Sequence, residues 1–216
     1  MKIYILILAL WFTPVWSAEC KDFRFRETSF TACTAKLPKD DIRLFLHDKT
    51  GKNFGQFQKL GNFLNQQGLD IVFATNGGMY HADRSPVGMY VENFSEFSPL
   101  ITIEGPGNFG LLPNGVFCFN KREFVILETR KFAQAGVHCQ YATQSGPLLV
   151  INGKIHPKFI KGGPSKFMRS GVGVSTDGLE TVFLISNEPV NFHHFASVFL
   201  DHLAINNALY LDGNIS

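Results

Sequence analysis

Residues 171–186 read GVGVSTDGLETVFLIS and carry the clearest β signature in the chain. Two apolar runs, 171–176 and 181–186, lie on either side of the dipeptide Asp177-Gly178. Residues of this kind tolerate a positive φ and close a tight turn between antiparallel strands. The stretch therefore predicts a β-hairpin.

Short apolar runs separated by turn residues continue on both sides of this hairpin. Such runs, rich in β-branched and aromatic residues, are typical of strands. Asn114-Gly115 and Asn152-Gly153 are predicted to close two further hairpins. The other predicted strands or strand pairs are 21–35, 41–48, 70–75, 86–93, 99–105, 115–120, 123–129, 146–153 and 207–216.

Two segments, 53–68 and 190–203, carry apolar residues at helical intervals and are predicted to be amphipathic helices. Gly68 stands where a helix is often terminated by a glycine. The apolar positions are Phe54, Phe57, Leu60 and Leu64 in the first segment and Phe192, Phe195, Phe199 and Leu203 in the second.

Strands outnumber helices, and no strict alternation of strand and helix runs along the chain. We therefore expect an α+β fold, a single domain with a mixed or antiparallel β-sheet and a few packed helices. Most of the 22 phenylalanines fall at periodic positions within the predicted elements, which favours an aromatic core over a stacking platform for bases or sugars.

The chain begins with one lysine, an apolar run that is too short to span a bilayer, and the small residues Ser17 and Ala18. This pattern predicts a signal peptide over residues 1–18, and residues 19–216 as the mature domain. We expect an exported protein, periplasmic or secreted, without stable membrane insertion. A net charge of +2 and the absence of a polybasic run argue against a nucleic-acid partner.

Four cysteines remain after the predicted cleavage. An even number in an oxidising compartment indicates disulfides, although four buried free thiols are an alternative. Three connectivities are possible. We favour the local pairs Cys20 with Cys33 and Cys118 with Cys139, because each pair brackets a predicted hairpin or short excursion.

The familiar motifs for nucleotide, flavin, serine-hydrolase, zincin and thioredoxin chemistry are all missing, and no cofactor is predicted. His193 and His194 are adjacent on a predicted helix and point about 100° apart, with His202 farther along, so we expect no metal site there. Ser145, in the sequence QSGP, is interpreted as a turn hydroxyl.

The predicted strand at 70–75 is followed by Asn76, Gly77 and Gly78. Glycines that adopt a positive φ let the backbone approach a ligand and leave N–H groups free to bind it. These three residues are therefore predicted to bind substrate, with a plain tight turn as the alternative. His81 follows on a predicted loop and is added to the same group.

Charged side chains end several other apolar segments. Asp212 lies just beyond an apolar strand, before Gly213, where a carboxylate can accept a proton or hold a hydroxyl; a plain Asp-Gly turn is the alternative. Glu92 supplies a second carboxylate. Arg169 precedes a glycine-rich strand and offers bidentate donors to a phosphate, with a surface salt bridge as the alternative.

Read in order, several of these segments resemble the phosphodiester glycosidase family, over about two thirds of the chain. The likeness lies in the Asn-Gly-Gly turn, in the arginine before the Val-Gly strand and in the terminal Asp-Gly, and it implies that Gly213 binds substrate. The segments are 75–93, 108–119, 142–159, 169–178, 182–203 and 207–216.

The resemblance implies hydrolysis of a small molecule or glycan at the glycosidic bond of a sugar-1-phosphodiester, on an α+β fold with a mixed sheet. A phosphate monoester is a good leaving group, so positive charge and N–H donors matter more than a strong acid. Arg169 and the two glycines suit that role. Asp212 or Glu92 would activate water or bond to the anomeric carbon, and Asp212 is the preferred carboxylate.

One departure from the family pattern follows Gly213, where Asn214 and Ile215 stand in place of further glycines. This predicts a C-terminally truncated domain. The alternative to the hydrolase is therefore a non-catalytic glycan-binding or structural envelope protein on the same fold. A third hypothesis is a different exported hydrolase that uses His81 or Ser145.

Overall fold

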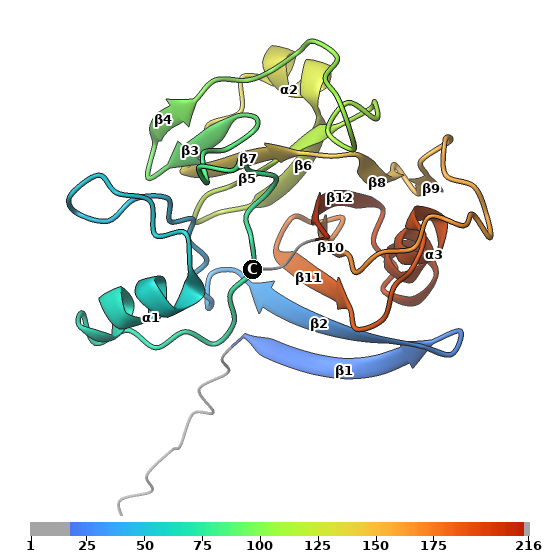
Figure 1. The fold of residues 1–216 in the computed structure, drawn as a ribbon, viewed down its shortest axis with the longest axis horizontal. Coiled ribbons are helices and arrows are strands. Elements are labelled where there is room, and N and C mark those ends of the chain that lie inside the picture. Colours follow the sequence, from blue (N-terminus) through green and yellow to red (C-terminus); the bar gives the residue numbers. More distant parts are fainter. Residues whose placement is uncertain (1–17, 214–216) are drawn as a thin grey trace, which may run out of the picture.

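In the computed structural model, which describes residues 18–213, two antiparallel β-sheets pack together, a helix covers the outer face of each, and a further helix lies to one side (Figure 1). The helices are α1 (Phe57–Asn65), α2 (Thr129–Ala135) and α3 (Phe192–Ser197), and α3 continues into the π-helical turn η1 (Val198–His202). The predicted α+β class is confirmed. The described pairings are all antiparallel, so the sheets are not mixed.

The larger sheet has seven strands in the order β1-β2-β11-β10-β12-β8-β9. Its centre is therefore β10, between β11 and the last strand of the chain, β12. The strands are β1 (Glu19–Phe25), β2 (Thr28–Lys36), β8 (Leu148–Ile151), β9 (Lys154–Ile155), β10 (Ser170–Val174), β11 (Glu180–Ser186) and β12 (Asn207–Asp212).

The smaller sheet has five strands in the order β4-β3-β7-β5-β6. Buried residues of β5, β6 and β7 pack against β10, β11 and β12 of the larger sheet, which forms the core between the sheets. The strands are β3 (Tyr90–Glu92), β4 (Ser95–Ser98), β5 (Gly115–Phe119), β6 (Phe124–Glu128) and β7 (Tyr141–Ser145).

The hairpin at 171–186 shows why the larger sheet is rich in glycine. Val172 and Val174 point into the core between the sheets. Gly171 and Gly173 face α3 and η1 instead, where a Cβ on Gly173 would lie 2.8 Å from Phe199. Glycine at alternate positions therefore lets the phenylalanines of the helix pack directly on the strand backbone. The second core, between this face and α3, is built on that contact.

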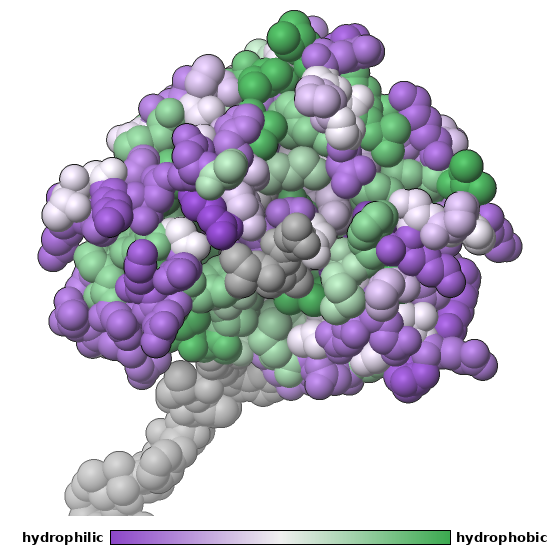
Figure 2. Space-filling model, viewed as in Figure 1, coloured by the Kyte–Doolittle hydropathy of each residue, from purple (hydrophilic) through white to green (hydrophobic). Residues whose placement is uncertain are grey.

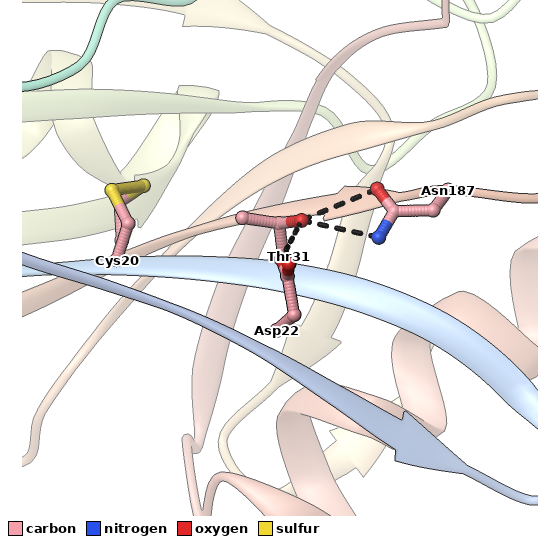
Figure 3. The surroundings of a disulfide bond; sticks show 5 residues. Cys20, Asp22, Thr31 and Asn187 are labelled. Atoms are coloured by element: carbon pink, nitrogen blue, oxygen red, sulfur yellow. Dashed lines mark hydrogen bonds between the residues drawn. A yellow bond between two sulfur atoms is a disulfide. The ribbon is translucent and has the colours of Figure 1, made fainter.

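Two disulfides join the predicted pairs, Cys20–Cys33 and Cys118–Cys139. The first links directly opposed residues of β1 and β2. Along the same strands, the Thr31 hydroxyl donates to Asp22 at 2.6 Å and accepts from the Asn187 amide at 3.1 Å (Figure 3). These contacts fasten the β1–β2 hairpin to the end of β11.

Local signals predicted several elements correctly. Hairpins form at 21–35, at 171–186 and around Asn152-Gly153, where both residues have a positive φ. Gly68 also has a positive φ and ends the turn after α1, as predicted. The segment 190–203 is helical over most of its length.

Three predicted strands are wrong. The segments 41–48, 70–75 and 99–105 form no strand, because none of them pairs with a neighbouring ladder beyond an isolated bridge at His47. Val72 is 56% exposed, so the apolar run before Asn76 is not a buried strand.

The dipeptide Asn114-Gly115 closes no hairpin. The Asn114 side chain is buried, donates to the carbonyl of Phe109 and accepts from the Thr129 hydroxyl, and Gly115 begins β5. Strand β7, which holds Ser145, and helix α2 were both missed by the sequence analysis. Ser145 is therefore a buried residue at a strand end and not a turn hydroxyl.

The predicted signal peptide covers residues 1–17, which lie outside the described residues, and Ala18. Within residues 18–213, no helix has the length and apolar character needed to cross a bilayer.

Candidate active site

Asp212 lies at the C-terminal end of β12, where hydrogen bonds to β10 fix its backbone. The hydroxyl of Ser170 donates to the Asp212 carbonyl at 2.7 Å and accepts from the Asp212 N–H at 3.3 Å. Ser170 itself is buried in the centre of the sheet. The backbone that carries this carboxylate is therefore held from both sides by one buried side chain.

The Asp212 carboxylate contacts the Asn76 side chain. Asn76 Nδ2 donates to Asp212 Oδ2 at 3.2 Å, and the Gly213 N–H donates to Oδ1 at 2.6 Å. Asn76 is buried, although it lies on an irregular segment far from β12 in the sequence. The fold thus brings the Asn-Gly-Gly and Asp-Gly motifs together.

Gly77 and Gly78 do not have the positive φ that was expected of them. They are needed for close approach instead, since a Cβ on Gly78 would lie 2.7 Å from the Thr143 hydroxyl of β7. Within residues 18–213, neither glycine N–H donates a hydrogen bond. Two backbone donors are therefore available beside Asn76.

Substitution of Gly78 by alanine should lower the free energy of unfolding by about 1–3 kcal/mol, because the new methyl overlaps Thr143. Removing that hydroxyl in the double variant Gly78→Ala/Thr143→Ala should recover part of the loss. Urea denaturation measures both.

Gly61→Ala is the matched control. Gly61 lies within α1, and a Cβ there would meet only Ile71, at 4.0 Å. Alanine there should stabilise the helix by up to about 1 kcal/mol. Equal effects at both positions would contradict the packing role of Gly78.

Arg169 is buried, with 1% of its surface exposed, so the expected alternative of a surface salt bridge is wrong. Its Nε donates to the carbonyl of Val190 at 2.8 Å, and its backbone N–H donates to Ser186 Oγ. Among residues 18–213 it pairs with no carboxylate. Burial without an anionic partner lowers the pKa of Arg169 below its ordinary value.

Aromatic rings take the place of a counter-ion. The guanidinium carbon lies 3.6 Å from the ring centre of Phe192, and Phe192 stacks on Phe159 with ring centres 4.8 Å apart. The ring centre of Tyr210 lies 5.6 Å from the same guanidinium carbon. Cation–π contacts of this kind hold a desolvated arginine without neutralising it.

Tyr210 was missed by the sequence analysis, although strand periodicity places it on the same face as Asp212. A Cβ on Gly213 would lie 2.8 Å from its hydroxyl. Burial raises the pKa of Tyr210 to about 12, and the nearby Arg169 partly opposes this shift. The phenol is thus a protonated donor at neutral pH, between the arginine and the Asp-Gly turn.

The raised pKa of Tyr210 predicts a loss of stability at alkaline pH. An unfolded tyrosine ionises near pH 10, whereas the folded residue stays protonated until about pH 12, so the unfolded state binds fewer protons in this window. The free energy of unfolding should fall as pH rises through it. Tyr210→Phe should reduce that slope, measured by urea denaturation between pH 9 and 12, and an unchanged slope would refute the assignment.

Two predicted site residues do not join this cluster. Glu92 ends β3 of the smaller sheet, where its Oε2 accepts from the Leu46 N–H at 2.9 Å and from the Tyr90 hydroxyl at 3.1 Å. His81 is exposed on a turn, and its N–H donates to the carbonyl of Ser85. No contact in the described residues links either side chain to Asp212 or Arg169.

Ser145 lies close to the cluster in a supporting role. Its hydroxyl donates to the carbonyl of Leu211 at 3.0 Å and thereby ties the end of β7 to β12. No group of three or more histidine, cysteine or acidic side chains within residues 18–213 has the arrangement of a metal site.

A sequence model of the phosphodiester glycosidase family matches residues 70–216, more than half of the chain. The chain belongs to the phosphodiester glycosidase family. The matched region contains Asn76, Arg169 and Asp212, so the cluster described above lies wholly within the family domain. The family resemblance read from the sequence is confirmed.

Two related proteins extend this finding. YigE of Escherichia coli K12, an uncharacterized protein, is 32% identical over 213 residues, which cover 98% of this chain and 83% of YigE. A solved structure of the zebrafish N-acetylglucosamine-1-phosphodiester α-N-acetylglucosaminidase catalytic domain, auto-inhibited by its pro-peptide, matches with a TM-score of 0.50 and 15% identity. That match covers 91% of this chain and 69% of the zebrafish chain. At this identity the likeness concerns the fold.

Proposed function

We propose that the protein is a hydrolase that cleaves the glycosidic bond of a sugar-1-phosphodiester. The observation that carries this proposal is that the Asp212 carboxylate meets Asn76 next to two available backbone N–H groups. Ser170, which pairs with Asp212 in the sheet, directly follows the buried Arg169, and Arg169 has no carboxylate partner among residues 18–213. Membership of the phosphodiester glycosidase family supports the same reaction. The zebrafish enzyme, whose name describes an N-acetylglucosamine-1-phosphodiester substrate, supplies the first sugar to test.

In this reaction the bond between the anomeric carbon and a phosphate oxygen breaks, and the phosphate monoester leaves with the bonding electrons. Negative charge therefore grows on the departing oxygens. Arg169 and the N–H groups of Gly77 and Gly78 stabilise it, because fixed donors in a site shielded from water act strongly on developing charge. The protonated Tyr210 hydroxyl, between Arg169 and Gly213, is a further donor at the same edge.

Asp212 acts at the anomeric carbon. It either removes a proton from the attacking water or bonds to the carbon before water replaces it. The Asn76 amide and the Gly213 N–H hydrogen-bond to the carboxylate, which fixes its orientation. The contribution of Glu92 stays a prediction, since its carboxylate is held by Leu46 and Tyr90.

We also propose that the chain is exported. The two disulfides are typical of proteins from oxidising compartments, and residues 1–18 have the composition of a signal peptide. The substrate would then be a sugar phosphodiester of the periplasm or the extracellular space.

The full chain, expressed with export so that both disulfides form, should release free sugar from the methyl ester of N-acetylglucosamine 1-phosphate. Proton NMR of the fresh product gives both the rate and the anomeric configuration, which distinguishes direct attack by water from a covalent intermediate. Turnover that survives His81→Ala removes that histidine from the reaction. Folded protein that binds but does not cleave several such esters would favour the glycan-binding alternative.

A further inference from the structure

A large cavity is lined in part by the Asn-Gly-Gly segment, and Asp212 is not among the residues that line it. It has a volume of about 570 Å³, is open to solvent on one side, and is lined by α1, by the irregular segments 39–46 and 69–80 and by strands of both sheets. Most of the surrounding side chains are apolar. Representative ones are Leu44, Phe54, Leu60, Leu64, Phe73 and Leu211.

A solvent-open hollow of this size has the dimensions of a ligand pocket and not of a packing defect. Protein interiors pack almost as densely as organic crystals, and few internal voids exceed a water molecule, whereas ligand pockets are typically about 300–1,000 Å³. The segment along the cavity also keeps apolar side chains in water, since Leu69, Ile71 and Val72 are 38%, 37% and 56% exposed. In Figure 2, apolar surface appears between hydrophilic rims in the part of the view that holds α1 and the loop before it.

The cavity and the candidate active site share one wall. Asn76, Gly77 and Gly78 line the cavity, and the same Asn76 donates to the Asp212 carboxylate. A phosphate bound to the N–H groups of the two glycines would therefore have its sugar on the Asp212 side. The alcohol on the opposite ester bond would point toward the cavity.

We propose that this cavity takes the alcohol part of the substrate and that the substrate is a sugar phosphodiester of a long-chain, apolar alcohol. The inference rests on the proposed function for the position of the phosphate. The apolar character of the alcohol is inferred from the lining of the cavity, because moving methylene groups from water into an apolar pocket of this size is favourable.

The test compares two esters of N-acetylglucosamine 1-phosphate, with methyl and with n-decyl alcohol, both used below the concentration at which the decyl ester forms micelles. Each fully buried methylene is worth about fourfold. The decyl ester should therefore have a kcat/KM at least about 100-fold above that of the methyl ester, even if the chain is only partly buried. Leu60→Trp, which fills the cavity from α1, should bring this ratio close to one.

Leu200→Trp is the matched control, because Leu200 lies in η1 against the other core and does not line the cavity. It should keep the wild-type ratio.

Calorimetric titration with n-decyl phosphate gives a readout that needs no turnover, and it should detect binding to the wild type and to Asp212→Asn but not to Leu60→Trp.

Failure of the cavity proposal and failure of the proposed glycosidase function would give different results. Equal kcat/KM for the two esters, without binding of decyl phosphate, would overturn the cavity proposal and leave the glycosidase function standing. Binding of decyl phosphate that Leu60→Trp abolishes, without cleavage of either ester, would uphold the cavity as an apolar site and reject the glycosidase function.

Discussion

Asp212→Asn should lower kcat by about a thousandfold or more while the protein stays folded. The substitution keeps the shape of the side chain but removes the charge that would attack the anomeric carbon or take the proton of water. Losses of this size follow when a group that acts directly on the reacting atoms is removed. Sugar release from the methyl phosphodiester, with enzyme in excess so that traces of activity are visible, measures the effect.

The structural cost of Asp212→Asn should be small. An asparagine can still accept from the Gly213 N–H, while the contact with Asn76 Nδ2 has to be rearranged. The free energy of unfolding should change by less than about 2 kcal/mol. Asp177→Asn is the control, because Asp177 also accepts two hydrogen bonds in an Asp-Gly turn but lies at the exposed end of the β10–β11 hairpin. Full turnover in Asp212→Asn would remove this carboxylate from the mechanism.

Sequence reasoning succeeded where the determining forces are local. Asp177-Gly178 and Asn152-Gly153 form the predicted turns because their side chains and φ preferences select that backbone without help from distant residues. The disulfide partners followed from other local segments, because each cysteine pair brackets a predicted hairpin or short excursion. The structure also brings together Asn76 and Asp212, two residues that the family resemblance had singled out, whereas their role in a site stays a prediction.

The failures arose where tertiary contacts override a local signal. The apolar run at 70–75 has the composition of a buried strand, but no strand pairs with it and it borders a cavity. Gly78 was read as a residue for positive φ, although close packing on Thr143 is what requires it. The contact of Glu92 with the Leu46 N–H joins residues 46 positions apart, and no local pattern predicts it.

The surroundings of Arg169 were the least predictable from the sequence. A charged residue is ordinarily exposed or paired, so composition alone gives no reason to bury it against Phe192. Its surroundings depend on helix α3 and on the loop before β10 folding over the same point. Because the charge is buried without a carboxylate partner among the described residues, its removal should affect activity and stability differently.

Arg169→Met should lower kcat by about a hundredfold or more and yet leave the fold as stable as before, or more stable. The loss of activity follows from removing the fixed positive charge beside the leaving phosphate, as for a single donor to a developing oxyanion. The stability follows from relieving a buried charge, whose desolvation costs several kcal/mol. Against this stand the lost hydrogen bond to Val190 and the lost cation–π contact with Phe192, together about 3–5 kcal/mol.

Because these terms nearly cancel, the melting temperature of Arg169→Met should lie within a few degrees of the wild type or above it. Arg26→Met is the matched control, since Arg26 pairs with Asp201 on the surface and should change stability by less than about 1 kcal/mol and turnover hardly at all. Differential scanning calorimetry and the sugar-release assay together decide the matter. A fold that collapses in Arg169→Met would assign the arginine to structure, whereas an inactive and equally stable variant means that the buried charge is retained for the substrate phosphate and not for the fold.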